Sequence, residues 1–452
     1  MPGRTLWVAA LLGAGLCAVI AVLLATQSIV VGSPASGWFY GYARPFTLAL
    51  LGPFVLAAAL CCALLAAMHS EFRSPGPAVW LLVWLIGVAG IEGLIRWHAP
   101  YSLESIFVSD EANSFYSVAQ RFTPTTLLKR QHRFRDRMPL HAQSNMPGKI
   151  MLIQFLQMAT RRTDVLPLLV ILISNAGAIL IYWFAADLFG DRRTGLLAAV
   201  LYLLTPGRLL FFPLMNTVTP VLALACACLV WRWFRAGRTS DAVVAGIATY
   251  WLVFFEPLPL VLGLLFVALA MLAIARGDIP AKRFFAQAAA FMAAFALTPA
   301  VLYLAFDFDS VHAFVSIRAH AVDFNVLTNR TYGTWVRANL FEFLLGVGPC
   351  QAVIFVGTLW RSLTGVGGWR ERVARPSAVV ALGLLAVLVV TDLGGLNRGE
   401  VFRLWIFLAC FFQIPVAHAC ATARTPYPIM IAITSSLLLT CVAASTMRLV
   451  IP

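Results

Sequence analysis

The chain has 452 residues, of which 61% are hydrophobic and only 12% are charged. Soluble domains carry about 25% charged residues, so this composition excludes a soluble globular protein and predicts a polytopic integral membrane protein. The net charge of +14 does not indicate a nucleic-acid partner, because most basic residues fall in short loops between hydrophobic segments.

The long apolar segments predict the membrane-spanning helices, because about 20 apolar residues are needed to cross the hydrocarbon. Together the segments predict an all-α fold, a polytopic transmembrane helical bundle of about thirteen helices. The first segment is too long for a signal peptide and is expected to stay as an uncleaved helix. Five segments are continuous: Leu6–Val31, Phe46–Met68, Pro77–Ile95, Val165–Leu188 and Pro428–Val450. Others begin near Gly195, Met215, Ala242, Leu258, Phe284, Asn339, Pro376 and Val401.

Three regions follow from this pattern. Residues 1–98 contain the first three membrane helices, residues 99–164 form a long extracytoplasmic loop, and residues 165–452 form the remaining bundle. A second outer segment covers residues 307–338. With a cytoplasmic N-terminus, the positive-inside rule explains the basic residues of most short loops. These include Arg73, Arg192, Arg193, Arg235, Arg276, Lys282, Arg370, Arg372 and Arg424.

The loop 99–164 departs from the positive-inside rule, since it lies outside in this topology and yet carries nine Lys or Arg residues. Ala112–Phe122 and Leu127–Phe134 within it mix apolar residues at helical spacing with basic and polar ones. This pattern is typical of short amphipathic helices lying in the membrane interface. We expect them to form a roof over an outer cavity.

The motif Ser109-Asp110-Glu111-Ala112 lies near the start of this loop and contains the candidate catalytic residues Asp110 and Glu111. A carboxylate within reach of an acceptor hydroxyl can act as a general base. The alternative is structural, since Ser109 or Asp110 could cap the helix that follows and a carboxylate is favoured at a helix N-terminus.

The acidic pair after an early membrane helix, followed by Tyr116 and a basic amphipathic stretch, resembles the GT-C superfamily of membrane glycosyltransferases. Protein O-mannosyltransferases and lipid A aminoarabinose transferases carry a similar Asp-Glu motif there, and later a His-Pro-Pro-like element. Asn145-Met146-Pro147-Gly148-Lys149 is similar to a degenerate form of that element. It lacks the His and the first Pro, so no role passes to Asn145 or Met146. Two extra helices also precede the loop.

The resemblance implies an inverting transferase that takes a sugar from a polyprenyl-phosphate donor, with Asp110 as the base and Glu111 orienting it or contacting the acceptor. The acceptor would be a lipid, a glycan or a protein. The enzyme would lie in the cell membrane, expected to be a bacterial cytoplasmic membrane, and the active site would face the periplasm or exterior. Tyr116 is included among the substrate-binding candidates.

Release of a phosphate also needs cationic donors, among which arginine binds with bidentate geometry. The candidates flank predicted outer helix ends. For each of them, contact with lipid headgroups or snorkelling is an equal alternative. Glu400 and Arg403 are three residues apart and would share a helical face, where they could pair. The phosphate or substrate candidates are Lys149, Arg208, Arg398, Glu400 and Arg403.

No cofactor is predicted with certainty. The histidines His132, His141, His312 and His320 share no metal-ligand spacing and are interpreted as surface or interface residues. A divalent cation on Asp110 and Glu111 is left open, although two adjacent acids alone make a poor site. The nine cysteines lie mostly in apolar segments and are interpreted as packing residues.

Two other functions fit the same features. A transporter or flippase of a lipid-linked or small substrate would also use broken helices and buried carboxylates. The lack of an obvious inverted repeat and the one-sided basic loop favour a fixed active site over alternating access. A scaffold that has kept a transferase fold without catalysis is the third alternative.

Overall fold

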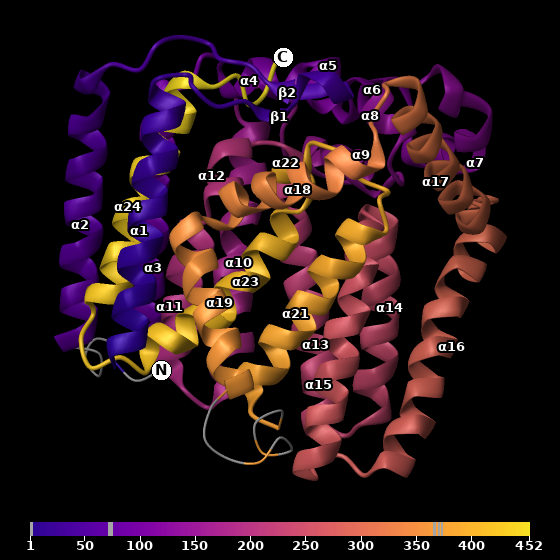
Figure 1. Ribbon diagram of the computed structural model, residues 1–452. Coiled ribbons are helices and arrows are strands. Elements are labelled where there is room, and N and C mark those ends of the chain that lie inside the picture. Colours follow the sequence, from indigo (N-terminus) through magenta and orange to yellow (C-terminus); the bar gives the residue numbers. More distant parts are fainter. Residues whose placement is uncertain (1–2, 71–75, 365–367, 369–370, 372–373) are drawn as a thin grey trace.

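The computed structural model describes residues 3–70, 76–364, 368, 371 and 374–452. Long helices run side by side through most of the molecule, and shorter elements cover one end (Figure 1). Arg73, Arg370 and Arg372, expected on the cytoplasmic side, lie outside the described residues. The long helices are α1 (Gly3–Ala25), α2 (Leu51–Ser70), α3 (Pro77–His98), α10 (Leu166–Phe189), α11 (Arg192–Leu203), α13 (Thr219–Ala236), α14 (Thr239–Phe255), α15 (Gly263–Arg276), α16 (Ala281–Phe306), α17 (Ser310–Leu327), α18 (Tyr332–Val347), α19 (Pro349–Thr364), α21 (Pro376–Leu393), α23 (Ile406–Ala421) and α24 (Tyr427–Thr446).

Within the described ranges, ten helices are long and apolar enough to cross a membrane, or up to eleven with the bent pair α18–α19. The multi-pass helical architecture is therefore confirmed, whereas the count of about thirteen is not. Two of the expected crossings, α14 and α23, have fewer than 18 residues, and the third is the pair α18–α19, which bends by 102°. Apolar segments that stay inside a bundle need not have full spanning length, so hydropathy alone overcounts them.

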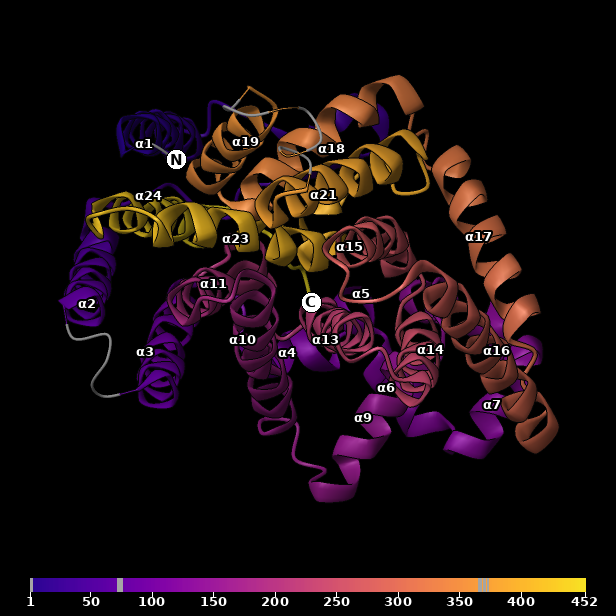
Figure 2. The ribbon, with the colours of Figure 1, turned by 90° about the horizontal axis from the view of Figure 1, so that it is seen from below.

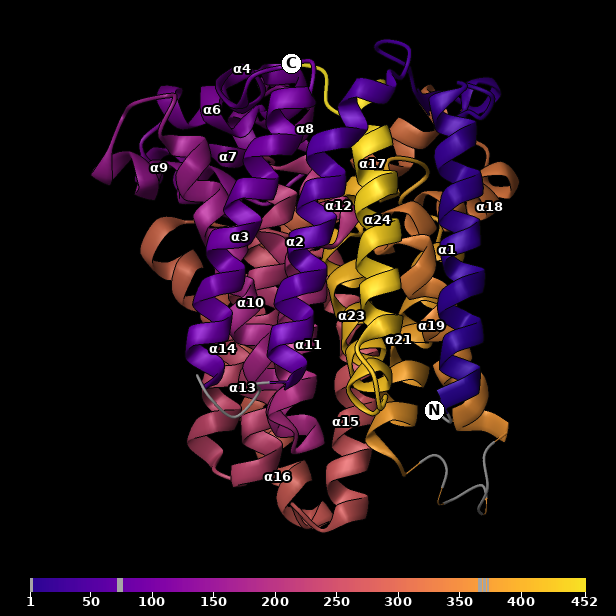
Figure 3. The same cartoon turned by 90° about the vertical axis from the view of Figure 1, so that its left-hand side faces the viewer.

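The centre of the bundle is formed by α11 and α23, which contact each other. Nearly every side chain of α23 is buried, and α11 is buried from Thr194 to Leu203. A helix that is hydrophobic on all sides is expected inside a bundle rather than at its surface. The outer helices surround this pair, and α1, α2, α3 and α24 cover one side (Figures 2 and 3).

One end of the bundle, here called the loop face, is formed by residues 99–164, an N-terminal hairpin and the helix α22 (Figure 1). The turns between α13 and α14 and between α15 and α16 lie at the opposite end. The helices expected at Ala112–Phe122 and Leu127–Phe134 are present as α5 to α7. The short elements are β1 (Val31–Ser33), β2 (Trp38–Tyr40), α4 (Leu103–Val108), α5 (Asp110–Asn113), α6 (Phe115–Arg121), α7 (Pro124–Phe134), α8 (Leu140–Gln143), α9 (Gly148–Ala159), α12 (Pro206–Phe211) and α22 (Val401–Leu404).

A closed polar network ties α3, α10 and α12 together inside the bundle. The Arg208 guanidinium lies 3.1 Å from the Glu92 carboxylate and donates to the side-chain oxygen of Asn175 at 2.5 Å. It also donates to the carbonyls of Tyr202 and Leu203. Arg208 is 0% exposed, so each of these partners compensates a charge that has left water.

Removal of one member of this ion pair should leave a buried uncompensated charge. We expect Arg208→Met to lower the free energy of unfolding by about 3–5 kcal/mol. The double variant Glu92→Met and Arg208→Met should recover part of that loss. Thermal unfolding of the purified chain in detergent measures both, and a double variant no more stable than Arg208→Met would contradict the pairing.

Candidate active site at the loop face

The Asp-Glu motif forms the first turn of α5, and Ser109 rather than Asp110 caps it. The Ser109 hydroxyl accepts hydrogen bonds from the backbone N–H groups of Glu111 and Ala112, each at 3.1 Å. The Asp110 carboxylate is therefore not used as the cap. It is exposed and accepts a hydrogen bond from the Ser117 hydroxyl. Glu111 is also exposed, so both carboxylates can meet a ligand from outside.

His141 on α8 links this motif to the charged residues below it. Its Nε2 lies 2.8 Å from the backbone carbonyl of Glu111, where a neutral imidazole donates the hydrogen bond. The charges of Arg403, Glu400 and Lys149 all act on the imidazole. Burial and the positive charge of Arg403 lower the pKa of His141 to about 4. His141 is therefore neutral at physiological pH and keeps its donor on Glu111.

Gly148 brings Lys149 to its partner. A Cβ at Gly148 would lie 2.6 Å from the Phe254 carbonyl oxygen, so only glycine lets the start of α9 approach the end of α14 this closely. Lys149 then reaches the Glu256 carboxylate at 3.0 Å and donates to the Asn145 side chain at 2.9 Å. Burial lowers the pKa of Lys149, and the adjacent Glu256 opposes that shift.

The position of Lys149 limits what it can do. Its side chain is 1% exposed, and its ammonium also faces the rings of Phe115 and Phe255. The Thr219 hydroxyl donates to the same Glu256 carboxylate at 2.5 Å. Lys149 is thus enclosed in the protein, and Glu256 neutralises most of its charge. From the sequence, Lys149 was a candidate for direct contact with a phosphate.

Glu400 is held between two arginines. Arg330 lies 2.9 Å from one carboxylate oxygen, and Arg403 pairs with the other. Burial raises the pKa of Glu400, but the charges of Arg403 and Arg330 outweigh this and lower it to about 2. The carboxylate is therefore ionised at physiological pH. Two arginines and one carboxylate leave one positive charge in this cluster.

The backbone of Glu400 is in the left-handed region, at φ 61°. A non-glycine residue there is held at a cost of about 1–3 kcal/mol, and such residues gather at functional sites. The conformation aims the carboxylate at both arginines. Arg403 keeps 15% of its side chain exposed, and its buried Nε has no hydrogen-bond partner among the described residues.

Three other predicted residues lie elsewhere or serve the scaffold. Arg208 is enclosed by the Glu92 network, so we remove it from the phosphate candidates. Arg398 donates to the carbonyls of Gly395 and Arg330 and lies over the Tyr332 ring, which stabilises the turn before Glu400. Tyr116 is half-buried and packs 5.5 Å from the ring of Phe107.

The sequence interpretation missed His141, Glu256 and Arg330 as members of the site. His141 was interpreted as a surface or interface residue because the histidines share no metal-ligand spacing. Arg330 lies in the second outer segment and is enclosed by the rings of Trp38, Phe324 and Trp335. The position of Arg330 in the second outer segment and Trp38 of the hairpin were the available signals. The side chain of His132 lies outside the described residues.

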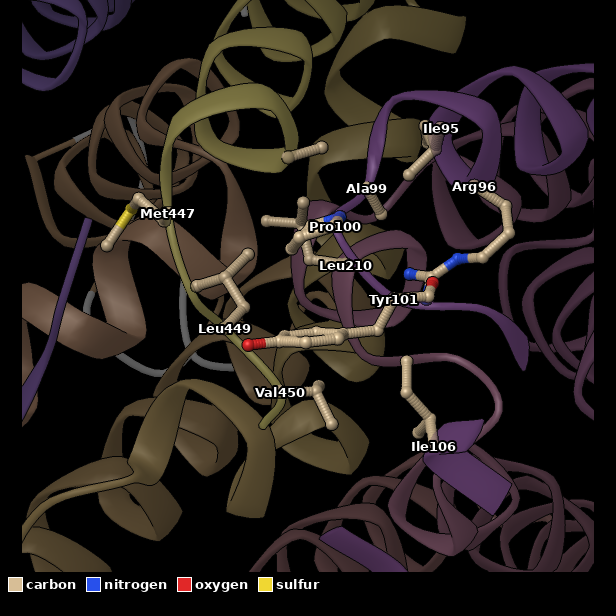
Figure 4. A pocket seen from close by; sticks show the side chains of 11 residues that line it. Ile95, Arg96, Ala99, Pro100, Tyr101, Ile106, Leu210, Met447, Leu449 and Val450 are labelled. Carbon is tan, nitrogen blue, oxygen red and sulfur yellow. The ribbon is translucent and has the colours of Figure 1, made fainter. Parts of the chain in front are cut away.

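A separate small pocket beside the C-terminal tail is mostly apolar (Figure 4). It is lined by Leu210, Val450 and the Tyr101 ring, and Arg96 at its edge donates to the Tyr101 carbonyl at 3.0 Å. The carboxylates Asp110 and Glu111 are not among its lining residues. This pocket therefore adds nothing to the chemistry of the motif.

In the part of the chain that the structure describes, His, Cys, Asp and Glu side chains form no group of three or more suited to a metal ion. The nine cysteines are free. Comparison with models of known protein families and with curated proteins gives no match to this chain.

Protonation of His141 should be visible in the pH dependence of stability. The folded state protonates it at about pH 4 and the unfolded state near pH 6.5, so the unfolded state gains protons first as the pH falls. Stability should decline between pH 6.5 and 4, and the His141→Gln variant should lack this part of the decline. Thermal unfolding at a series of pH values measures both curves, and parallel curves would refute the assignment.

Proposed function

We propose that the protein is a membrane glycosyltransferase that transfers a sugar from a polyprenyl-phosphate donor to an acceptor at the loop face. The observation that carries the proposal is the pairing of Arg330 and Arg403 with the single carboxylate Glu400. His141 is bonded to the backbone of the exposed Asp-Glu motif and is close enough to Arg403 for that charge to lower its pKa. The proposed proton acceptor, Asp110, and the proposed anion site at Arg403 thus both belong to the loop face.

The arginine cluster supplies what a phosphate leaving group requires. When the bond between the anomeric carbon and the phosphate oxygen breaks, the electron pair stays on the phosphate. Preorganised donors stabilise that developing charge without rearrangement. Arg403 keeps 15% of its side chain exposed, while Glu400 fixes one end of its guanidinium. Arg330 is buried on the other side of Glu400 and adds positive charge to the cluster without direct contact with the phosphate.

The acceptor side is supplied by Asp110. Its carboxylate takes the proton of an acceptor hydroxyl while the hydroxyl oxygen attacks the anomeric carbon, which inverts the configuration in one displacement. Ser117 donates to Asp110 and holds its orientation. Glu111 is exposed next to it and is assigned to the acceptor, and its carbonyl is fixed by His141.

This assignment puts the reaction at the membrane surface, where a polyprenyl chain stays in lipid and its phosphate reaches the loop face. We assign the loop face to the extracytoplasmic side of a cell membrane. The arginine-rich turns between α13 and α14 and between α15 and α16 lie at the opposite end of the bundle, and the positive-inside rule assigns such loops to the cytoplasm. The acceptor is a lipid, a glycan or a protein that presents a hydroxyl group.

Transfer of radiolabelled sugar from a polyprenyl-phosphate donor in proteoliposomes tests the proposal. Asp110→Asn should lower the rate at least 100-fold, because a positioned general base contributes about 10²–10⁴. Asp164→Asn is the matched control, since Asp164 is an exposed carboxylate of the same loop that pairs only with the nearby Arg162 among the described residues. Arg403→Gln should raise the KM for the donor.

Full activity of Asp110→Asn would overturn the base assignment. Movement of the labelled lipid across the bilayer without a covalent product would overturn the transferase and favour a flippase. Wild-type function after replacement of both Asp110 and Glu111 would favour a scaffold.

A further inference from the structure

A cavity of the loop face lies apart from the arginine cluster. It has a volume of about 620 Å³ and lies between the roof helices α7 and α8 and the helices α16 and α17. These four elements lie at one corner of the molecule (Figure 1). Cavities of about 300–1,000 Å³ are typical of small-molecule sites.

The walls of this cavity are rich in hydrogen-bond acceptors. Asp307, Asp309 and Asp323 line one side, and Gln131 lines the other. Gln131 is 5% exposed, and its buried Oε1 has no hydrogen-bond partner among the described residues. The exposed carboxylates of Asp307, Asp309 and Asp323 are the acceptors that a ligand in the cavity can reach, and they require N–H or O–H donors from it.

The other lining groups narrow the class of ligand. The carboxylates disfavour a phosphate, and Arg135 in the same wall disfavours a compact polycation. Hydroxyl groups both donate and accept, so they suit a wall that mixes carboxylates, amides, histidine and arginine. Tyr303 and Phe308 add ring surfaces against which the C–H faces of a sugar can pack.

The position of the cavity relates it to the candidate active site. The short helix α8 separates the two, because His141 faces the Asp-Glu motif and Gln143 lines the cavity. Leu304, Val311 and Val315 on the adjoining helices are exposed apolar residues, as expected where a surface meets lipid. A headgroup in the cavity can therefore carry an alkyl chain along this surface.

We infer that this cavity binds a hydroxyl-rich saccharide headgroup, which is the acceptor of the proposed reaction. The role as acceptor rests on the proposed function, whereas the binding itself does not. The saccharide belongs either to a free glycan or to a glycolipid, since both present the same hydroxyl chemistry.

Saturation-transfer NMR on the full chain in nanodiscs tests the inference. The probes are methyl disaccharides of glucose, mannose, galactose and N-acetylglucosamine, with spermidine as a cationic probe. At least one disaccharide should give a signal that falls at least tenfold in Gln131→Leu and in Asp323→Asn. Gln120→Leu and Asp164→Asn are matched controls on the exposed outer loop and should retain the signal.

Unfolding temperatures near wild type in either cavity variant establish that lost binding does not come from lost folding. Disaccharide signals unchanged in both variants, or absent in the wild type, overturn the inference, as does binding of spermidine alone. The same measurement with a dodecyl glycoside of the disaccharide that binds distinguishes a glycolipid from a free glycan. Tighter binding of the dodecyl form indicates a glycolipid, and equal binding indicates a free glycan.

The transfer assay and the binding assay separate the two proposals, because each proposal predicts a different result. Disaccharide binding in the wild type and in Asp110→Asn, without sugar transfer by the wild type, would support the saccharide site and contradict the transferase. Normal transfer with no disaccharide binding would do the reverse.

Discussion

Glu400 is the residue on which the loop face depends, because one buried carboxylate holds two arginines from different parts of the chain. Arg330 comes from the segment before α18, and Arg403 lies on α22. Breaking a buried ion pair by removing one partner is strongly destabilising. The carboxylate that pairs with both arginines belongs to a residue whose backbone is in the left-handed region.

The rest of the loop face is arranged around that carboxylate. The β1–β2 hairpin supplies Trp38 against Arg330, and the Ser36 hydroxyl accepts from the backbone N–H of Thr331 at 2.8 Å. His141 connects the roof to the same cluster and is kept neutral by burial and by Arg403. Segments far apart in sequence thus meet at one charged cluster, while a hydrophobic cluster that includes Phe107, Phe115 and Ile153 packs the loop against the bundle.

The helical bundle and the roof helices could be predicted from sequence, because apolar length and helical spacing are local properties. The pairing of Glu400 with Arg403 was likewise foreseen as an alternative to substrate binding, since the two residues are three apart. The partnership of Lys149 with Glu256 could not be predicted, because it depends on a close approach of α9 and α14 that Gly148 permits. Arg208 looked like a surface cation for the same reason, since its partner Glu92 is distant in sequence.

We propose that a phosphate of a lipid carrier binds at Arg403 beside the Asp-Glu motif. The most direct measurement is a structure of the chain in nanodiscs with polyprenyl phosphate added. We expect phosphate density in contact with Arg403, with Glu400 still paired to Arg330 and Asp110 facing the same space. Phosphate density at the opposite end of the bundle, or only among lipid headgroups away from Arg403, would contradict it.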